Sequence, residues 1–210
     1  SDIDAWIRLF GEAATALGAE YDERTLYQTM YKKALEGTPD CGGVMTFNYL
    51  SGEPVTNLDE GRPLLFRKPD AAFTLANVMR AHLTSACASL RIGMDILAAE
   101  HVELDAMTGH GGFFKAEGIG QKIMSAALGT PVTVMETAGE GGPWGMAVLA
   151  AFLQKKEAGE SLSDYLTAKV FRGAKSVTVS ASEAEANGFA AFMDAYQKSL
   201  AVERAAVDAY

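Results

Sequence analysis

Apolar side chains recur at intervals of three and four residues at the start of the chain. Within residues 1–17 they form one stripe, made of Ile3, Trp6, Ile7, Phe10, Ala14 and Leu17. This spacing places them on one face of a helix and predicts an amphipathic helix. Ser1, Asp2 and Asp4 stand at its start, where such residues cap a helix and complement its dipole. A second, more polar helix is predicted over residues 22–36.

The regular pattern stops over residues 38–69. This segment carries four of the six prolines and two short β-like runs, "GGVMTFNYL" and "PLLFR". It is too long for a simple connecting loop, so we expect an irregular excursion that has a role in function or in packing. The longest helix is then predicted over about residues 70–99. Its apolar stripe consists of Leu75, Val78, Met79, Leu83, Cys87, Leu90, Met94 and Leu97.

Strand and helix patterns alternate in the second half of the chain. The run "VELDAM" is followed by a glycine loop and a helix over residues 116–128, and "PVTVME" by a second glycine loop and a helix over residues 143–158. A last strand, "KSVTVS", precedes an alanine-rich helix over residues 182–206. Alternation with short loops predicts parallel strands, so the expected fold class is α/β, with a sheet flanked by helices.

Glycines cluster after both central strands of the expected sheet. They are Gly109, Gly111 and Gly112 in the first loop, and Gly139, Gly141 and Gly142 in the second. Ligands of α/β sheets bind beyond the carboxyl ends of the strands, and glycine lets a backbone approach a flat or anionic ligand closely. The two loops are therefore expected to form one continuous lip. Glycine turns of this kind also occur for purely steric reasons, so both interpretations stay open.

The helix after the second glycine loop is unusually rich in small residues. Gly145, Ala147, Ala150 and Ala151 leave little side-chain bulk along it. This composition favours a tight contact with a neighbouring helix or sheet over direct contact with a ligand.

Composition excludes several classes of protein. A chain of 210 residues is long enough to bury a sizeable core. The net charge of -9, with no block of Lys or Arg, argues against nucleic acid as a partner. Cys41 and Cys87 cannot form a disulfide framework and are expected to be reduced thiols, while His82 and His101 are too scattered to suggest a metal site. No signal peptide or apolar run approaching 18 residues is visible, so we expect no membrane contact and a cytoplasmic location.

Taken in order, the motifs resemble the C-terminal domain of the FGGY family of carbohydrate kinases. They are a Trp-bearing helix, Gly-Gly before "YLSGEP", a long helix, "TGHGGFFKAEG" and "LGTPVTVMETAGEGGPWGMAVLA". The resemblance is closest to the ribulokinase and xylulokinase types and covers about residues 1–152. It implies a ribonuclease H-like, actin-like ATPase domain over residues 1–210, incomplete at its N-terminus. Residues 38–69 would be the irregular excursion and residues 182–206 the C-terminal helix.

The resemblance also implies an activity. Kinases of this family hold ATP and Mg²⁺ between two domains and bind the sugar mainly on the N-terminal domain. Here the sugar would be a ketopentose, xylulose or ribulose. An aspartate acts as the base, and it is expected upstream of Ser1, because this chain contains no Gly-Gly-Asp or Asp-x-Gly-Thr stretch. The chain alone should therefore be inactive and carry no catalytic residue. The resemblance also allows a homodimer, because family members are often dimers.

Six positions match family positions close to the nucleotide: Gly111, Gly112, Lys115, Ala116, Ser1 and Ala5. The two glycines would lie against adenine and ribose, and Lys115 or Ala116 would make a further nucleotide contact. Ser1 and Ala5 match positions that approach the nucleotide in the related glycerol kinases. The "SGEP" loop departs from the family pattern, because Pro-Val-Thr stands where Arg-Thr-Pro often follows Gly-Glu. A contact made by the family's arginine is therefore not carried over.

Several alternatives remain open from the sequence. His110 fits a turn position better than a ligand contact, and Phe113 and Phe114 suit either stacking on adenine or filling the core. A Rossmann-like domain binding a dinucleotide or S-adenosylmethionine is a second hypothesis, with Glu136 on the ribose, although the GxGxxG spacing is not met. A non-enzymatic scaffold domain, with the small-residue helix as its interface, is a third.

Overall fold

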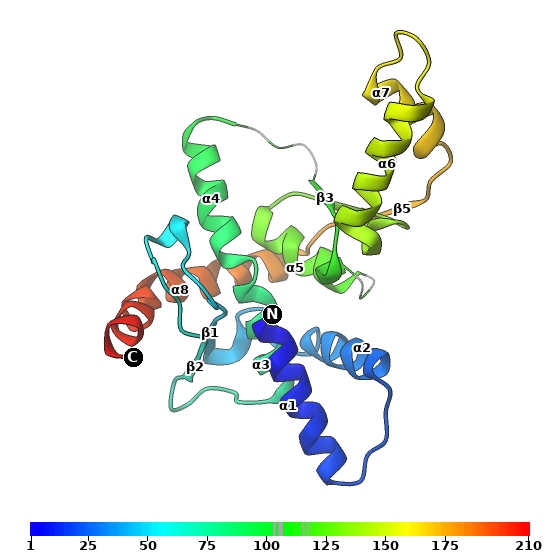
Figure 1. Ribbon diagram of the computed structural model, residues 1–210. Helices are drawn as coiled ribbons and strands as arrows, with labels where there is room; N and C mark the ends of the chain where they lie inside the picture. The colour runs from blue at the N-terminus through cyan, green and yellow to red at the C-terminus, as the bar shows by residue number, and fades with distance from the viewer. Residues whose placement is uncertain (103, 105–106, 115, 117) are drawn as a thin grey trace.

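The computed structural model describes residues 1–102, 104, 107–114, 116 and 118–210 (Figure 1). Its α-helices are α1 (Asp2–Ala16), α2 (Glu23–Ala34), α3 (Leu75–Ser85), α4 (Ala88–Ala99), α5 (Ile119–Leu128), α6 (Gly141–Lys155), α7 (Leu162–Tyr165) and α8 (Glu183–Ala209). The strands are β1 (Val44–Phe47), β2 (Leu64–Arg67), β3 (Met107–Gly109), β4 (Val132–Met135) and β5 (Ser176–Val179). Short helical turns complete the chain: η1 (Cys41–Gly43), η2 (Pro54–Thr56), η3 (Gly112–Phe114), η4 (Ala138–Glu140) and η5 (Leu166–Val170).

The described strands form two small sheets. β1 and β2 are antiparallel, with Val44 opposite Arg67. In the second sheet β3 and β4 are parallel, with Met107 opposite Val132, and β5 is antiparallel to β4. The predicted alternation of strands and helices is confirmed, and β3 and β4 are parallel as expected. The direction of β5 was not predicted from the sequence. An alternating apolar pattern indicates a strand and says nothing about its direction, which the connecting path decides.

Helix α3 lies at the centre of the core. Every residue of α3 after Leu75 is buried, because α2, β1 and α5 pack around it. A helix surrounded in this way must satisfy its polar side chains inside the protein. Helix α8 supplies much of the remaining core through Phe189, Phe192, Met193 and Tyr196, and the Tyr196 ring lies 4.6 Å from that of Phe47.

The single long helix predicted over residues 70–99 is wrong. Residues 70–74 are not helical, Thr74 caps α3, and a two-residue turn at Ala86 and Cys87 separates α3 from α4. At this break the Ser85 hydroxyl donates a hydrogen bond of 2.6 Å to the Thr46 carbonyl on β1. The apolar stripe continues across so short a turn, which is why the sequence did not reveal the break.

The other predicted boundaries shift by a few residues. Helices α5 and α6 start three residues later and two residues earlier than expected, at Ile119 and Gly141. Of the predicted strand "VELDAM", the described part of β3 contains Met107, whereas residues 103, 105 and 106 lie outside the described residues.

The small residues of α6 do not make the close contact that was expected. No residue of α6 is buried, and a Cβ added at Gly145 would meet nothing within 4 Å. One face packs on the segment that follows, with the Trp144 and Phe171 rings 5.6 Å apart. The opposite face exposes Met146, Leu149 and Leu153. In Figure 1, α6 and α7 extend away from the helices around α3.

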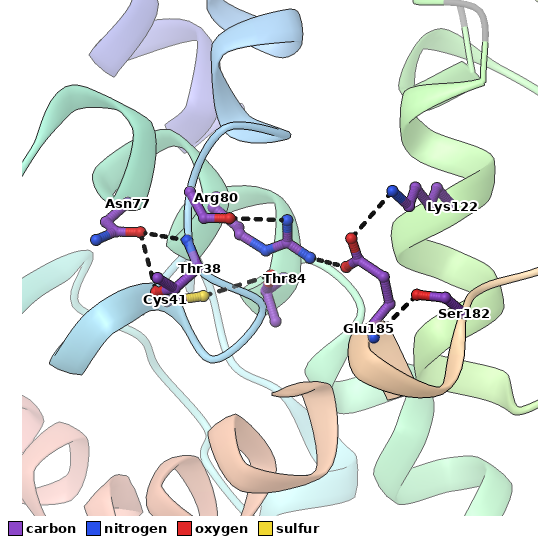
Figure 2. Close-up of polar contacts among 9 residues, drawn as sticks. Thr38, Cys41, Asn77, Arg80, Thr84, Lys122, Ser182 and Glu185 are labelled. Carbon is purple, nitrogen blue, oxygen red and sulfur yellow. Dashed lines mark hydrogen bonds and ion pairs between the residues drawn. The ribbon is translucent and has the colours of Figure 1, made fainter. Parts of the chain in front are cut away.

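A buried ionic cluster joins three helices (Figure 2). Arg80 on α3 donates to Glu185 on α8, and both side chains are more than nine-tenths buried. The other Glu185 oxygen lies 3.1 Å from Lys122 Nζ on α5. Arg80 also donates to the Gly37 carbonyl over 3.3 Å. The cluster therefore fixes α3, α5 and α8 relative to one another.

Two further contacts in Figure 2 anchor the segment before β1. The Thr38 backbone N–H donates to the Asn77 amide oxygen over 2.8 Å, and the Cys41 thiol lies 3.6 Å from the Thr84 hydroxyl. Both cysteines are free and buried. Burial raises the pKa of each thiol, Cys41 and Cys87, to about 12, so both are unreactive near neutral pH.

Helix α8 also holds the loop between β1 and β2. Tyr196 donates to the Tyr49 hydroxyl over 2.7 Å. The fully buried Glu203 accepts the Arg62 backbone N–H at 2.6 Å. Arg204 donates to the Thr56 carbonyl over 2.6 Å and to the neighbouring Asn57 carbonyl. The loop is thus clamped at three points by one helix.

Replacement of Arg80 by Met tests the ionic cluster. The change leaves Glu185 buried beside Lys122 alone, so we expect the free energy of unfolding to fall by about 3–5 kcal/mol in urea denaturation. Lys198→Met is the control, because it removes an exposed ion pair with Asp194 on α8 and should cost less than about 1 kcal/mol. Similar losses in the two variants would contradict the structural importance of the cluster.

Glu203→Gln tests the buried carboxyl. Burial raises the pKa of Glu203 above its ordinary value, so the folded state loses stability as the pH rises past the unfolded pKa of roughly 4.3. The amide keeps an oxygen for Arg62 and removes the ionisation. We expect Glu203→Gln to be more stable than the parent at pH 8, where the parent must bury an ionised carboxyl to fold.

Thermal unfolding between pH 4 and pH 8 measures this difference. The advantage of Glu203→Gln should shrink toward pH 4, where the carboxyl becomes mostly protonated in the unfolded state as well. Asp208→Asn, an exposed carboxylate on the same helix, should show no such trend. If the stability of the parent and of Glu203→Gln changed in parallel with pH, ionisation of the buried Glu203 would not be costing the folded state stability.

Candidate functional site

The two glycine loops lie against each other, as the sequence predicted. The Gly111 N–H donates to the Ala138 carbonyl over 2.8 Å. A Cβ built on Gly141 would lie 3.8 Å from the Gly111 Cα. The loop after β3 and the loop after β4 therefore form one edge, which we call the glycine lip (residues 109–112 and 138–142).

The glycine lip presents bare backbone. A Cβ added at Gly112 would meet nothing within 4 Å, and Gly112 is exposed. Gly111 has φ +97° and Gly141 has φ +56°, conformations that side-chain-bearing residues rarely adopt. Glycine is thus required at these two positions by the backbone, and Gly112 leaves space above it. Such a ledge can accept a flat ligand directly against the main chain.

The aromatic residues of the first loop, Phe113 and Phe114, lie behind the glycine lip. A Cβ at Gly109 would fall 2.5 Å from the tip of the Phe114 ring, and one at Gly120 would fall 2.9 Å from the Phe113 ring. The two rings meet edge to face with centroids 5.5 Å apart. These contacts favour the core-filling interpretation of both phenylalanines, while His110 is exposed in the loop.

Helix α5 ties the glycine lip to the sheet. The Gln121 amide donates to the Val132 carbonyl on β4 over 3.0 Å and to the Val177 carbonyl on β5 over 2.8 Å. Lys122, the next residue, joins the buried cluster with Glu185. The lip therefore rests on a helix that is fixed on both sides, which suits a preformed binding surface.

The structure separates the predicted site residues into two groups. Gly111 and Gly112 form part of the lip, and Ala116 packs against the core. Lys115 lies outside the described residues. Ser1 caps α1, and Ala5 is exposed on that helix. Ser1 lines a cavity whose walls include no residue of the glycine lip.

The cavity that Ser1 lines, which we call the α1 cavity, has a volume of about 230 Å³. It is lined by residues 1–3 at the start of α1, residues 48–50 and 53 in the clamped loop, and residues 85, 86 and 89 around the α3–α4 turn. Beneath it the buried His82 ring lies 5.0 Å from Trp6, and its Nδ1 is 3.4 Å from an oxygen of Asp2 and from one of Asn48. His82 has the structural position that the sequence favoured.

Sequence reasoning missed some residues of both sites. The Ala138 carbonyl, which joins the two glycine loops, leaves no signal in a sequence. Asp2 was interpreted as a helix-capping residue, although its side chain is buried at the α1 cavity. Glu53 stands in the "SGEP" motif, which the sequence did single out, and lines the same cavity.

Neither a metal centre nor a membrane span is found in the described part of the chain. No three His, Cys, Asp or Glu side chains there come together in a way that could hold a metal ion. No helix among them combines the length and apolar character needed to cross a bilayer.

Comparison with known families identifies the chain. The sequence model of the FGGY family of carbohydrate kinases, C-terminal domain, matches residues 1–153. The chain therefore belongs to this family, as its motifs indicated. No curated protein sequence matches it.

Solved structures give the same fold. The xylulose kinase of Rhodospirillum rubrum aligns with a TM-score of 0.63 and 13% identity, over 96% of this chain and 37% of that one. A xyloylose kinase from Brucella ovis aligns at 0.65 and 19%, over 99% and 38%. The Plasmodium falciparum glycerol kinase with ADP aligns at 0.59 and 17%, over 94% and 37%. The chain thus spans less than two-fifths of these kinases.

The comparisons decide the fold class. The chain is an α/β domain with the ribonuclease H-like, actin-like fold of FGGY C-terminal domains. The family match also argues against a Rossmann-like domain, because it assigns a different fold. The sequence already lacked the GxGxxG spacing of such a domain.

Gly109→Val tests the packing behind the glycine lip. The new side chain would collide with the Phe114 ring, so we expect the free energy of unfolding to fall by about 1–3 kcal/mol. Gly112→Val adds a side chain into open space and should change it by less than about 0.5 kcal/mol. Equal losses in urea denaturation would show that Gly112 is not open.

Proposed function

We propose that this chain is the ATP-binding part of a carbohydrate kinase. The observation that carries the proposal is the bare backbone of the glycine lip, at the carboxyl ends of two parallel strands. Open α/β sheets bind nucleotides at such an edge. Gly111 and Gly112 would lie against the adenosine, with Lys115, Ala116, Ser1 and Ala5 as further predicted contacts.

The proposed reaction is transfer of the γ-phosphate of ATP to a ketopentose, xylulose or ribulose. Support comes from the family and from the xylulose kinases among the structural neighbours. A gluconate kinase and a glycerol kinase also align, so the sugar is the finer part of the proposal. ATP supplies the phosphoryl group, and Mg²⁺ would neutralise its charge.

The residues of this chain bind and position the nucleotide. They supply no catalytic base, which we expect in an N-terminal kinase domain of a longer protein. The sugar and the residues that hold Mg²⁺ would also lie there. Closure of two domains would exclude water from the phosphoryl group. The chain alone should therefore bind ATP and phosphorylate neither xylulose nor ribulose.

The proposed domain covers residues 1–210, beyond the family match at residue 153. The aromatic side chains of α8 support this extent, because they fill the same core as α1, α3 and β1. Formation of a homodimer and a cytoplasmic location stay predictions from the sequence.

Gly112→Leu tests the proposed nucleotide site. The side chain would occupy the space above the lip, so we expect the affinity for ATP and ADP to fall by about tenfold or more. The midpoint of thermal unfolding should stay within about 2 °C, because the added atoms meet no protein neighbour. Calorimetric titration measures the affinity.

Gly93→Leu is the matched control. Gly93 lies on α4, and a Cβ added there also meets nothing within 4 Å. It should leave nucleotide affinity unchanged. Unchanged ATP binding in Gly112→Leu would remove the lip as the adenosine site, and binding of NAD or S-adenosylmethionine in place of ATP would favour the Rossmann-like alternative.

A further inference from the structure

Helix α5 connects the glycine lip with the segment that follows the family match. We propose that Gln121 of this helix is a positioning residue, which sets the spacing of the two glycine loops and thereby the affinity for the nucleotide. The inference rests on the proposed function, because the site concerned is the proposed nucleotide site. It makes residues 176–185, beyond the matched segment, part of what controls that site.

The first glycine loop is carried by α5. A Cβ added at Gly120 would collide with the Phe113 carbonyl oxygen and would lie 2.9 Å from the Phe113 ring. The turn at Gly112–Phe114 therefore packs directly on the backbone of the helix. Any shift of α5 would carry this turn, and Gly112 with it.

The second glycine loop is carried by β4. The strand ends at Met135, shortly before the loop begins at Ala138. The Gly111 N–H donates to the Ala138 carbonyl over 2.8 Å, and this bond requires α5 and β4 to stand in one relative position. A ligand that lies on both loops would therefore sense any movement of α5 relative to β4.

Gln121 fixes that relative position. Its side chain is 3% exposed, and its amide donates to the Val132 carbonyl of β4 over 3.0 Å and to the Val177 carbonyl of β5 over 2.8 Å. These two bonds use both N–H groups of the amide. Breaking either bond would leave a buried donor unsatisfied, so the pair holds the helix and the two strands in one arrangement. Gln121 thus acts on the ligand through the lip and not by contact.

The start of α8 holds α5 from another direction. The Ser125 hydroxyl accepts the Ala181 N–H over 2.9 Å, just before α8 begins. Lys122 lies 3.1 Å from the buried Glu185 carboxylate (Figure 2). These contacts, like the bond to Val177, come from residues beyond the family match at residue 153. The position of the first glycine loop therefore depends on this later segment.

The coupling must work in both directions. If the position of α5 changes the affinity for a ligand, binding of that ligand must stabilise the position of α5 by the same factor. The Ala181 amide reports on this effect, because its hydrogen bond to Ser125 is part of what holds α5. A nucleotide on the lip should therefore protect an amide that lies outside the lip.

Gln121→Met keeps the length of the side chain and removes both donors. We expect it to lower the affinity for ATP and ADP about fivefold or more, measured by calorimetric titration of the folded protein. Thr178→Val is the matched control, because the bond between the Thr133 and Thr178 hydroxyls joins β4 to β5 without α5. The control should leave the affinity unchanged. Ser125→Ala is a smaller change that should weaken binding in the same direction, and it serves if Gln121→Met does not fold.

NMR spectra of the ¹⁵N-labelled chain give a readout that a general loss of stability would not move. Without nucleotide, the amide signals of Gly111 and Gly112 should shift in Gln121→Met and Ser125→Ala and stay in place in Thr178→Val. In the parent, ATP should slow hydrogen exchange at the Ala181 amide, and Gln121→Met should abolish this protection.

Unchanged nucleotide affinity in folded Gln121→Met, or in Ser125→Ala where the first variant does not fold, would overturn the inference and leave the proposed function standing. If the parent bound no ATP, the proposed function would fail instead. The signals of Gly111 and Gly112 would then still decide whether Gln121 positions the lip, because they are recorded without nucleotide.

Discussion

The burial of α3 is the constraint on which the rest of the structure depends. Because α2, β1 and α5 enclose this helix, the charge of Arg80 must be met inside the protein. Glu185 meets it from α8 and binds Lys122 of α5 with its other oxygen. The fold therefore depends on the chain returning to the core after some hundred residues. Removing the C-terminal helix would leave Arg80 with one carbonyl contact at Gly37.

This arrangement supports two surfaces of different chemistry. The glycine lip exposes backbone at its glycines, and its shape depends on side chains being absent at Gly111, Gly112 and Gly141. Helix α5 holds it against the sheet through Gln121. The α1 cavity is made of side chains, and helix α8 holds its loop wall through Tyr196 and Arg204. Both surfaces are thus fixed by helices that meet at the buried ionic cluster.

Membership of the FGGY family accounts for the fold, while residues 154–210 lie beyond the matched segment. Within this segment, α8 fills part of the core and holds the loop between β1 and β2. The contacts of the described residues do not explain the exposed apolar face of α6, with Met146 and Leu153. Its opposite face packs on Phe171 as an ordinary amphipathic helix does.

The sequence by itself determined the elements and the glycine loops. Spacing of three and four predicted α1, because local periodicity records which face of an element is buried. Helices α2 and α8 and the strands were predicted from the composition and order of their segments. The same periodicity could not reveal the break at Ala86 and Cys87 or the direction of β5. Only the tertiary structure decided that Arg80 meets Glu185, that Gly111 meets Ala138, and that Asp2 lies in a cavity. Those contacts join residues far apart in the chain, and their partners are chosen by packing, which leaves no pattern in a single sequence.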